Sequence, residues 1–488
     1  MELDRAACRQ AVVAKDGRFD GRFVVAVDTT GIYCRPVCPA RTPRADRCQY
    51  FALAAQAEAA GFRACLRCRP EVAPGRAVSA VDARAQLVAD AVALIDRGFL
   101  VEGSQDDLAA HLGVTARHLR RAIVAALGVT PGQLDRTRRF ALAKQLLHDS
   151  RASVAAIALA AGFGSVRQWN AAFRAQFATT PSSFRRGAPT TAAPDATTAA
   201  LTVRLDARPP FAGRALLAFL AGRAITGVEA IDGACYRRTV DAGWLEVRVV
   251  DDARRPGVRV TVAAALAPRL IALVARVRAL FDLDAEPAVI ATHLRADPRL
   301  RAAVDAEPGR RVPGAFEPFE VAVRTVLGQQ VSVAAASTLC ARLTARFGAA
   351  VATPFAALTH AAPTAATLAR APLDAVAAIG LPRTRAATVI ALAQAVVDGR
   401  VRWDRPRDPL AQMAALTAIP GVGPWTASYL AMRALAWPDG FPAGDLVLQR
   451  QLGVTSRAAA EAASAPWRPW RAYAAMHLWA AAGARQGG

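Results

Sequence analysis

Two short cysteine pairs near the start of the 488-residue chain constrain its fold more than any other feature. Cys34 and Cys38 form the first pair, Cys65 and Cys68 form the second, and 26 residues separate the two pairs. Paired cysteines at this spacing are the usual sequence form of a tetrahedral zinc site with four thiolates. A small module gains from such a site, because zinc binding contributes about 10–16 kcal/mol of folding free energy. The spacing therefore predicts one Zn²⁺ bound by these four cysteines.

The charge balance favours a polyanionic partner. The chain has 61 Lys+Arg against 39 Asp+Glu, which gives a formal net charge of +22. An excess of this size is typical of proteins that bind nucleic acid. Drift in composition explains why nearly all the basic residues are arginine, but it does not explain the excess. The charge therefore predicts nucleic acid as the partner.

Several sequence properties indicate a cytoplasmic protein without a membrane partner. No uncharged apolar run reaches the roughly 18 residues of a membrane span, and the N-terminus lacks the order of a signal peptide. Thiols stay reduced in the cytoplasm, so clustered cysteines there favour a metal over disulfides. Cys8 and Cys48 lack paired spacing, and we expect them to be ordinary thiols.

Changes in periodicity divide the chain into five segments. Helical periodicity precedes a stretch with no apolar pattern, strand-like patterns begin at residue 201, and the chain is helical again from about residue 285. We expect a multidomain protein, mainly α with α+β parts. The predicted segments are a four-cysteine zinc module at 1–78, a helix-turn-helix domain at 79–187, a linker at 188–200, a small α+β subdomain at 201–284 and helical domains at 285–488.

The residues around the cysteines carry a specific pattern. They read TTGIYCRPVCPAR over residues 29–41 and AAGFRACLRC over residues 59–68. This pattern closely resembles the N-terminal zinc domain of the Ada DNA-repair and response proteins, over about residues 5–75. The resemblance implies that Cys34 accepts a methyl group from a methylphosphotriester in DNA. Arg41 and Arg67 are the predicted DNA contacts of this module.

The chemistry of a zinc-bound thiolate agrees with that role. A sulfur bound to Zn²⁺ keeps thiolate character at neutral pH and remains a nucleophile. A methylphosphotriester is neutral, so it does not repel the approaching thiolate. Methylation removes one negative charge from the site and lowers its repulsion from the DNA backbone, which makes the modification an electrostatic switch.

Two helix-turn-helix patterns follow the zinc module. The first reads DLAAHLGVTARHLRR over residues 107–121, and the second reads VAAIALAAGFGSVRQWNAAFR over residues 154–174. Gly113 and Gly162 mark the turns, and Thr115 and Ser165 are the predicted caps of the second helices. One such pattern is weak, because the same arrangement occurs in ordinary helix packing.

Two patterns in tandem, followed by FATTPSSFR at residues 177–185, resemble the AraC-type transcription-regulator domain. The resemblance implies binding to promoter DNA, with RNA polymerase as a further partner. The predicted groove-facing residues are Arg117, His118, Arg121, Arg167, Asn170 and Arg174. The resemblance to Ada ends here, because no Pro-Cys-His active site of a second methyltransferase occurs. The oligomeric state stays open.

The C-terminal part contains a helix-hairpin-helix pattern. It reads LTAIPGVGPWTA over residues 416–427, and FPAGD follows at residues 441–445. Glycines let the backbone turn tightly, and amides at the start of the next helix bind a DNA phosphate. Gly421, Gly423 and Thr426 are the predicted DNA contacts. One such hairpin alone also occurs in DNA-binding proteins without catalytic activity.

Further stretches make the C-terminal match specific. They are FLAGRA at 219–224, FEVAVRTVLGQQVSV at 319–333, WRPWRAY at 467–473 and HLW at 477–479. Residues 201–482 resemble the helix-hairpin-helix DNA glycosylases of the AlkA type, which act on 3-methyladenine. The resemblance implies that Asp445 is the catalytic carboxylate, which stabilises positive charge on the sugar. It assigns the base pocket to Phe219, Trp425, Tyr429 and Trp479, whose rings attract an electron-poor alkylated base.

Three details refine this prediction. Bifunctional glycosylases place a Schiff-base lysine after the hairpin, whereas Trp425 stands there and no Lys occurs between Leu201 and Gly488, which predicts a monofunctional enzyme. Only Cys235 and Cys340 lie in this region, so we expect no iron-sulfur cluster. Gln330 occupies the position of the base-flipping wedge, where the family pattern has an apolar residue.

Two alternative functions remain open at this point. One is a transcription regulator whose C-terminal part binds damaged DNA without excision. The other is a zinc-stabilised protein that compacts DNA without preference for methylated sites.

Overall fold

The computed structural model describes residues 5–16, 19–70, 73, 83–150, 152–185, 200–404 and 409–484. The chain forms two compact units. The first contains residues 1–209, 252–278 and 283–285, and the second contains residues 210–251, 279–282 and 286–488. The predicted linker 188–200 lies outside the described residues, except that Ala200 begins a strand. The prediction of a multidomain, mainly helical chain with α+β parts is confirmed.

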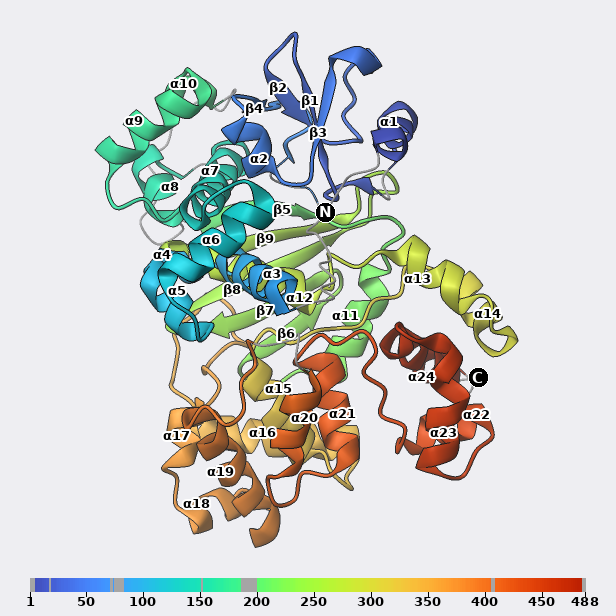
Figure 1. Cartoon of the computed structure of the whole chain (residues 1–488). Helices are drawn as coiled ribbons and strands as arrows, with labels where there is room; N and C mark the ends of the chain where they lie inside the picture. Colours follow the sequence, from blue (N-terminus) through green and yellow to red (C-terminus); the bar gives the residue numbers. More distant parts are fainter. Residues whose placement is uncertain are drawn as a thin grey trace. The chain divides into compact units, whose positions relative to one another are not determined.

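A small sheet organises the N-terminal module of the first unit (Figure 1). Its strand order is β3-β1-β2-β4, in which β1 pairs antiparallel with β2 and β3, and β2 pairs parallel with β4. A core around Phe23 and Val25 lies between this sheet and α1. The elements are α1 (Arg5–Ala14), β1 (Val24–Val27), β2 (Ile32–Cys34), η2 (Ala45–Arg47), β3 (Cys48–Phe51), α2 (Ala54–Ala59) and β4 (Arg63–Ala64).

The next module is entirely helical. Both predicted turns use glycine in the left-handed region, with φ +72° at Gly113 and +77° at Gly162. Thr115 accepts from the amide of His118 and Ser165 from that of Gln168, so both predicted caps are confirmed. The helices are α3 (Ala83–Asp96), α4 (Phe99–Glu102), α5 (Gln105–His111), α6 (Ala116–Leu127), α7 (Pro131–Asp149), α8 (Val154–Ala160), α9 (Val166–Phe177) and α10 (Pro181–Phe184).

The first unit also contains two strands from the predicted α+β subdomain. β5 (Ala200–Asp206) pairs antiparallel with β9 (Gly257–Ala263), with Val203 opposite Val260. Alternate apolar residues of β5 are buried, as the period of a half-buried strand requires. The chain continues through η4 (Ala264–Arg269) into α12 (Leu270–Leu280), whose last two residues fall in the second unit.

The second unit combines a three-stranded meander with many helices (Figure 1). The meander runs antiparallel from β6 to β7 to β8. The elements are α11 (Gly213–Ala221), β6 (Glu229–Asp232), β7 (Cys235–Val240), β8 (Gly243–Val250), α13 (Pro287–Leu294), α14 (Pro298–Ala306), α15 (Pro318–Leu327), α16 (Val333–Phe347), α17 (Ala365–Ala369), α18 (Leu373–Ala377), α19 (Arg383–Val397), α20 (Pro409–Thr417), α21 (Pro424–Arg433), α22 (Leu446–Leu452), α23 (Arg457–Ser464), η5 (Ala465–Trp467) and α24 (Arg471–Ala484).

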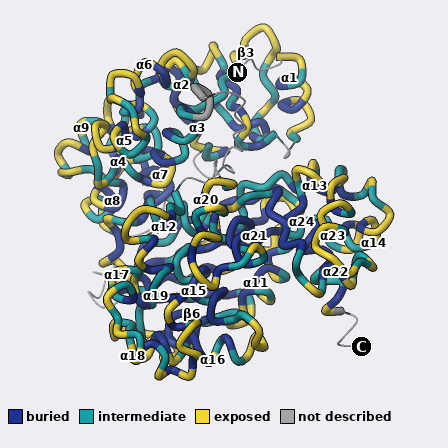
Figure 2. The backbone as a smooth tube through the Cα atoms, turned by 60° about the horizontal axis from the view of Figure 1, so that its bottom comes forward, coloured by how far each residue is buried: buried dark blue, intermediate teal, exposed yellow. Residues whose placement is uncertain are grey.

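Buried apolar side chains hold this helical array together. One core contains Val326 of α15, Val389 of α19, Leu416 of α20 and Leu430 of α21. Helix α24 is also buried over most of its length (Figure 2). Burial fixes α21 and α24, which carry four of the predicted site residues. Among the described residues, none of the helices combines the length and the apolar character that crossing a bilayer demands.

Candidate metal centre and candidate active site

The four paired cysteines converge on one point in the first unit. Cys34 ends β2, and Cys65 directly follows β4, which pairs parallel with β2. The parallel pairing therefore brings the two cysteine pairs together. Their four sulfur atoms all lie within 4.8 Å of one another. Four convergent thiols suit a tetrahedral zinc ion, and the backbone amide of Arg35 donates to Cys68 Sγ over 3.3 Å, as it would to a thiolate.

The cysteines differ in their access to solvent. Cys34 is half-buried, whereas Cys38, Cys65 and Cys68 are buried. Cys34 is thus the member of the cluster that an external reagent reaches most readily. The two arginines predicted to contact DNA, Arg41 and Arg67, are both exposed close to the cluster in the sequence.

The two remaining cysteines of this module belong to its apolar core. Cys8 of α1 and Cys48 of β3 are buried among Val12, Phe23 and Val25. They lie outside the four-cysteine group, which agrees with the interpretation of both as ordinary thiols.

The predicted groove-facing residues of the helical module lie on its two second helices. Arg117, His118 and Arg121 are exposed on α6, and Arg167 and Arg174 are exposed on α9. Asn170 on α9 is half-buried. Leu119 and Trp169 face the interior of the same two helices. Each helix therefore buries one face and presents basic side chains on the other, as a recognition helix does.

A cavity of about 640 Å³ lies within the second unit. Trp425 and Tyr429 of α21, Asp445 at the start of α22, and Trp479 of α24 line its wall. The structure therefore brings together four predicted site residues from three different helices. Phe219, the fifth predicted member of the site, is not among the residues that line the cavity.

The carboxylate of Asp445 accepts four N–H groups. Its Oδ1 caps α22 by accepting from the backbone amides of Val447 and Leu448, both over 3.0 Å. The indole Nε1 of Trp479 also donates to Oδ1 over 3.1 Å, and that of Trp425 donates to Oδ2 over 3.2 Å. Four donors fix the orientation of the carboxylate and leave Oδ2 with a single protein partner. Asp445 is therefore an oriented anion in the cavity wall.

The aromatic residues form a layered wall. Trp425 and Tyr429 stack with an angle of 12° between their planes and 5.5 Å between ring centroids. The ring of Trp479 lies 6.2 Å from that of Tyr429, tilted by 57°. The spacing of four residues on α21 places Trp425 and Tyr429 on one helical face. This wall has the planar shape and electron-rich faces that an electron-poor base requires.

Two arginines that the motifs did not single out also line the cavity. Arg433 is buried, donates to Tyr429 Oη over 2.7 Å, and also bonds the carbonyl oxygens of Pro313 and Gly314. The guanidinium carbons of Arg223 and Arg433 lie 3.8 and 5.0 Å from the centroid of the Phe219 ring. Phe219 thus supports the two arginines. The pattern FLAGRA carried a signal for Arg223, whereas no motif marked Arg433.

These arginines change the acidity of Tyr429. Burial raises the pKa of its phenol, but the positive charges of Arg433 and Arg223 outweigh burial and hold the pKa of Tyr429 below its ordinary value. Burial in turn lowers the pKa of Arg223. The hydroxyl of Tyr429 is thereby held in place as a hydrogen-bond acceptor from Arg433.

The predicted hairpin lies between α20 and α21. Gly421 adopts φ +86°, whereas Gly423 is extended and caps α21. The side chain of Thr426 is buried, and its hydroxyl accepts from the side-chain amide of Gln329 over 3.1 Å. Only the backbone of Thr426 is therefore placed to make its predicted DNA contact. The same side-chain amide of Gln329 also donates to the backbone carbonyl of Gly421 over 3.0 Å.

Gln330 follows at the turn between α15 and α16. It is exposed, with a left-handed φ of +58°. The bonds from Gln329 tie this turn to the hairpin, a positioning role that the quoted stretch 319–333, which contains Gln329, did not reveal.

Four family models match successive parts of the chain. They are the metal binding domain of Ada at residues 7–71, a helix-turn-helix domain at 108–187, the AlkA N-terminal domain at 202–317, and the HhH-GPD superfamily of base excision DNA repair proteins at 323–463. A Mycobacterium tuberculosis protein named "Probable bifunctional transcriptional activator/DNA repair enzyme AlkA" is 41% identical over 484 residues, which are 98% of this chain and 97% of that protein. The chain belongs to this bifunctional AlkA family.

Two further relatives each match one part of the AlkA-family chain. The DNA-3-methyladenine glycosylase 2 of Escherichia coli is 34% identical over 277 residues, which cover 56% of this chain and 95% of that protein. The bifunctional transcriptional activator/DNA repair enzyme Ada of Escherichia coli is 39% identical over 122 residues, which cover 25% of this chain and 32% of that protein. The predicted combination of Ada-type, helix-turn-helix and AlkA-type parts is confirmed.

The family models also locate the two sites. The Ada metal-binding match contains the four convergent cysteines, and supports a zinc site there. The HhH-GPD match contains the hairpin, Trp425 and Asp445, and supports a DNA glycosylase that binds DNA.

Proposed function

We propose that this chain hydrolyses the N-glycosidic bond of alkylated bases in DNA as a monofunctional glycosylase of the 3-methyladenine class. We propose further that Cys34 accepts a methyl group from DNA methylphosphotriesters, and that the chain regulates transcription at promoter DNA. The observation that supports the glycosylase most directly is the carboxylate of Asp445, which four N–H donors hold in the wall of an aromatic cavity.

The cavity receives the extruded base. Trp425 and Tyr429 present stacked rings, and a base alkylated at N3 or N7 is electron-poor, so aromatic faces favour it over an unmodified base. The hairpin around Gly421 and Gly423 binds the phosphate backbone through its amides. Gln330 fills the space that the base leaves in the duplex.

Asp445 stabilises the bond cleavage. As the C1′–N bond breaks, its electron pair leaves with the base and positive charge develops on the sugar. The oriented carboxylate opposes that charge, and water adds its oxygen to C1′ and releases a proton. The products are the free base and an abasic site. No lysine occurs between Leu201 and Gly488, so the chain offers no ε-amine there for a Schiff base that would cut the backbone.

Cys34 performs the methyl transfer. Zinc bound by the four cysteines would keep the Cys34 sulfur as a thiolate at neutral pH. This sulfur, the most accessible of the four, attacks the methyl carbon. A sulfur–carbon bond forms, the carbon–oxygen bond of the ester breaks, and the phosphodiester anion leaves. The thioether product cannot repeat the reaction, and the site has lost one negative charge. DNA binding by Arg41, Arg67 and the helices α6 and α9 then strengthens.

The regulatory part of the proposal concerns the helical module. Basic side chains on α6 and α9 would read promoter DNA in the major groove. RNA polymerase as a further partner and a cytoplasmic location belong to the same proposal and rest on the sequence.

The first test measures base release and methyl acceptance together. Wild-type protein and Asp445→Asn are incubated with DNA treated with a methylating agent, free bases are identified by chromatography, and mass spectrometry locates methyl groups on cysteine. We expect wild type alone to release 3-methyladenine and both proteins to gain one methyl on Cys34.

Each alternative has its own outcome. Equal base release by wild type and Asp445→Asn would overturn the assignment of Asp445. A methyl on Cys34 with no base release by wild type would favour the regulator that binds damaged DNA without excision. Absence of both reactions, with tight DNA binding, would favour a DNA-compacting protein.

A further inference from the structure

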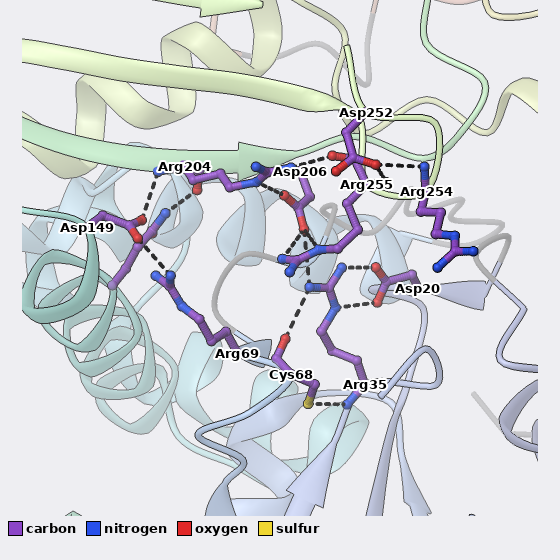
Figure 3. Close-up of polar contacts among 11 residues, drawn as sticks. Asp20, Arg35, Cys68, Arg69, Asp149, Arg204, Asp206, Asp252, Arg254 and Arg255 are labelled. Carbon is purple, nitrogen blue, oxygen red and sulfur yellow. Dashed lines mark hydrogen bonds and ion pairs between the residues drawn. The ribbon is translucent and has the colours of Figure 1, made fainter. Parts of the chain in front are cut away.

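A buried arginine connects the cysteine cluster to a strand of the AlkA N-terminal match. Arg35 directly follows Cys34 and is 3% exposed. Its backbone amide donates to Cys68 Sγ over 3.3 Å, and its Nη1 donates to the Cys68 carbonyl over 3.2 Å. The same guanidinium bonds both carboxylate oxygens of Asp20 (Figure 3). Cys68 and Asp20 therefore hold this side chain in one position.

The far end of Arg35 meets Asp206, the last residue of β5. Arg35 Nη1 lies 3.3 Å from Asp206 Oδ2, and the side chain of Asp206 is 2% exposed. Arg204 Nε and Arg255 Nη2 also donate to this carboxylate, each over 2.8 Å (Figure 3). Burial raises the pKa of Asp206, but the charges of Arg35, Arg204 and Arg255 outweigh burial and lower it overall, so the contact is ionic.

A second connection runs from the other cysteine pair. Arg69 follows Cys68, and its Nη1 pairs with Asp149 Oδ1 over 2.7 Å. Asp149 ends α7, and its Oδ2 accepts the backbone amide of Arg204 on β5 over 3.0 Å. Gln145, also on α7, donates to the Arg204 carbonyl. Side chains of α7 therefore bind the backbone of β5 on residue Arg204, whose partner across the strand pair is Arg259 of β9.

We propose that these contacts form an intramolecular docking surface, through which the state of the cysteine site controls the order of β5. The docking surface comprises Asp20, Arg35, Arg69, Asp149, Arg204 and Asp206 (Figure 3). The zinc module of the same chain meets this end of β5 directly through Arg35 and Asp206, and indirectly through Arg69 and Asp149 of α7. Residues 202–317 match the AlkA N-terminal domain, so the change in the cysteine site acts on the first strand of the glycosylase part.

The chemistry of the contacts explains the coupling. Asp206 is buried, so the loss of Arg35, the most buried of its three guanidinium partners, destabilises this carboxylate even though Arg204 and Arg255 still pair with it. Cys68 holds Arg35 at both its backbone amide and its guanidinium, and Asp20 holds the guanidinium as well. A metal ion would fix Cys68, and its removal frees Cys68 to move. Movement of Cys68 therefore removes two of the contacts that direct Arg35 towards Asp206, and it moves the neighbouring Arg69 away from Asp149. Any effect of Cys34 methylation on the order of β5 rests on the proposed methyl transfer, whereas the effect of metal removal does not.

Hydrogen exchange of the full chain tests the proposal. Exchange of the β5 amides, the Arg204 amide above all, is measured by mass spectrometry with stoichiometric zinc and again after a zinc chelator. In wild type we expect chelation to accelerate exchange in β5 by about tenfold or more. In Asp206→Asn we expect fast exchange in β5 already with zinc bound, and less than about a twofold further change on chelation.

The matched control is Asp46→Asn. Asp46 lies in the same module and pairs with the exposed arginines Arg44 and Arg47. This variant removes the same charge without touching β5, so it should behave as wild type. Zinc content, measured on each variant, shows that Asp206→Asn still binds the metal.

Two results would overturn the docking surface. One is exchange in β5 of wild type that chelation leaves unchanged, and the other is a wild-type response in Asp206→Asn. A separate arm tests the proposed methyl transfer. The protein is incubated with methylated DNA, and mass spectrometry shows whether Cys34 carries a methyl group. Failure to find methyl on Cys34 would contradict the proposed methyl transfer, whereas the chelator arm would still decide on the docking surface.

Discussion

The indole nitrogen of Trp425 donates a hydrogen bond to Asp445 over 3.2 Å, although 20 residues separate the two in the chain. The ring that would stack on the base therefore also orients the carboxylate proposed to stabilise the sugar. Trp479 makes the equivalent bond to the other carboxylate oxygen over 3.1 Å. The proposed base recognition and the proposed catalysis would thus be joined through two indoles, and substitutions can separate them.

Asp445→Asn should abolish most of the base release without unfolding the protein. Asparagine is as good an N-cap as aspartate, so the cap of α22 survives and stability should change by less than about 1 kcal/mol. Loss of the negative charge should lower the excision rate by about 100-fold or more. Single-turnover excision and thermal unfolding are the measurements. Asp305→Asn, at an exposed ion pair with Arg295, should leave both values unchanged. An excision rate of Asp445→Asn near that of wild type would contradict the assignment.

Two tryptophan substitutions should affect different properties, the excision rate in one case and stability in the other. Trp425→Phe keeps an aromatic face but removes the donor to Asp445, so we expect excision to slow by roughly tenfold with little loss of stability. Trp467 is 1% exposed and donates to Asp297 Oδ2 over 2.7 Å, away from the cavity-lining residues. Trp467→Phe should therefore lower stability by about 1–3 kcal/mol and leave the rate of the folded enzyme unchanged. The pair is compared by excision rate and by chemical denaturation, and identical profiles would argue against a special role for Trp425.

The sequence predicted those features that depend on local spacing. The cysteine pairs, the glycine turns at Gly113 and Gly162 and the caps at Thr115 and Ser165 all depend on residues a few positions apart. The bond between Arg35 and Asp206 joins residues 171 positions apart, and that between Arg433 and Pro313 joins residues 120 apart. No spacing rule applies at such separations, because only the tertiary fold brings these side chains together. For the same reason the sequence did not predict the contacts of Gln329, whose partners lie 92 and 97 residues away.

The two hairpin glycines should respond differently to alanine. A Cβ on Gly421 would overlap Thr388 Oγ1, and its φ of +86° is strained for alanine, so Gly421→Ala should destabilise the protein by about 1–3 kcal/mol. Gly423 is extended with open space around it, so Gly423→Ala should fold as wild type does. If its amide faces a DNA phosphate, the added methyl group should weaken DNA binding. Thermal unfolding and DNA titrations at fixed salt test both variants, and tight binding by Gly423→Ala would exclude that contact.

Gln330→Leu should accelerate excision from duplex DNA. An apolar wedge stacks between bases after the lesion is extruded, and burying a leucine contributes about 1.5 kcal/mol, or about tenfold. Gln330 is exposed at a turn, so the change should leave the fold intact. Excision of the same lesion from single-stranded DNA, which needs no wedge, should not change. A slower duplex reaction would show that Gln330 replaces the base by hydrogen bonds instead.

Acid should destabilise the second unit through His477 of α24. This side chain is 3% exposed, and its Nδ1 has no hydrogen-bond partner among the described residues. Burial, together with the positive charge of Arg310, lowers the pKa of His477 from 6.5 to about 4. Between these two pKa values the unfolded chain binds the proton and the folded chain does not. The stability is therefore fully present above about pH 6.5 and is lost as the pH falls towards 4, by about 2–3 kcal/mol in total.

His477→Gln should flatten this part of the pH profile, because glutamine does not titrate. Seven of the eight tryptophans lie in the second unit, so tryptophan fluorescence during urea unfolding reports mainly on that unit. The unfolding free energy of wild type, measured at pH 7, 5.5 and 4.5, should fall by about 2–3 kcal/mol more than that of the variant. Parallel profiles for the two proteins would mean that His477 takes up its proton in the folded state as readily as in the unfolded chain.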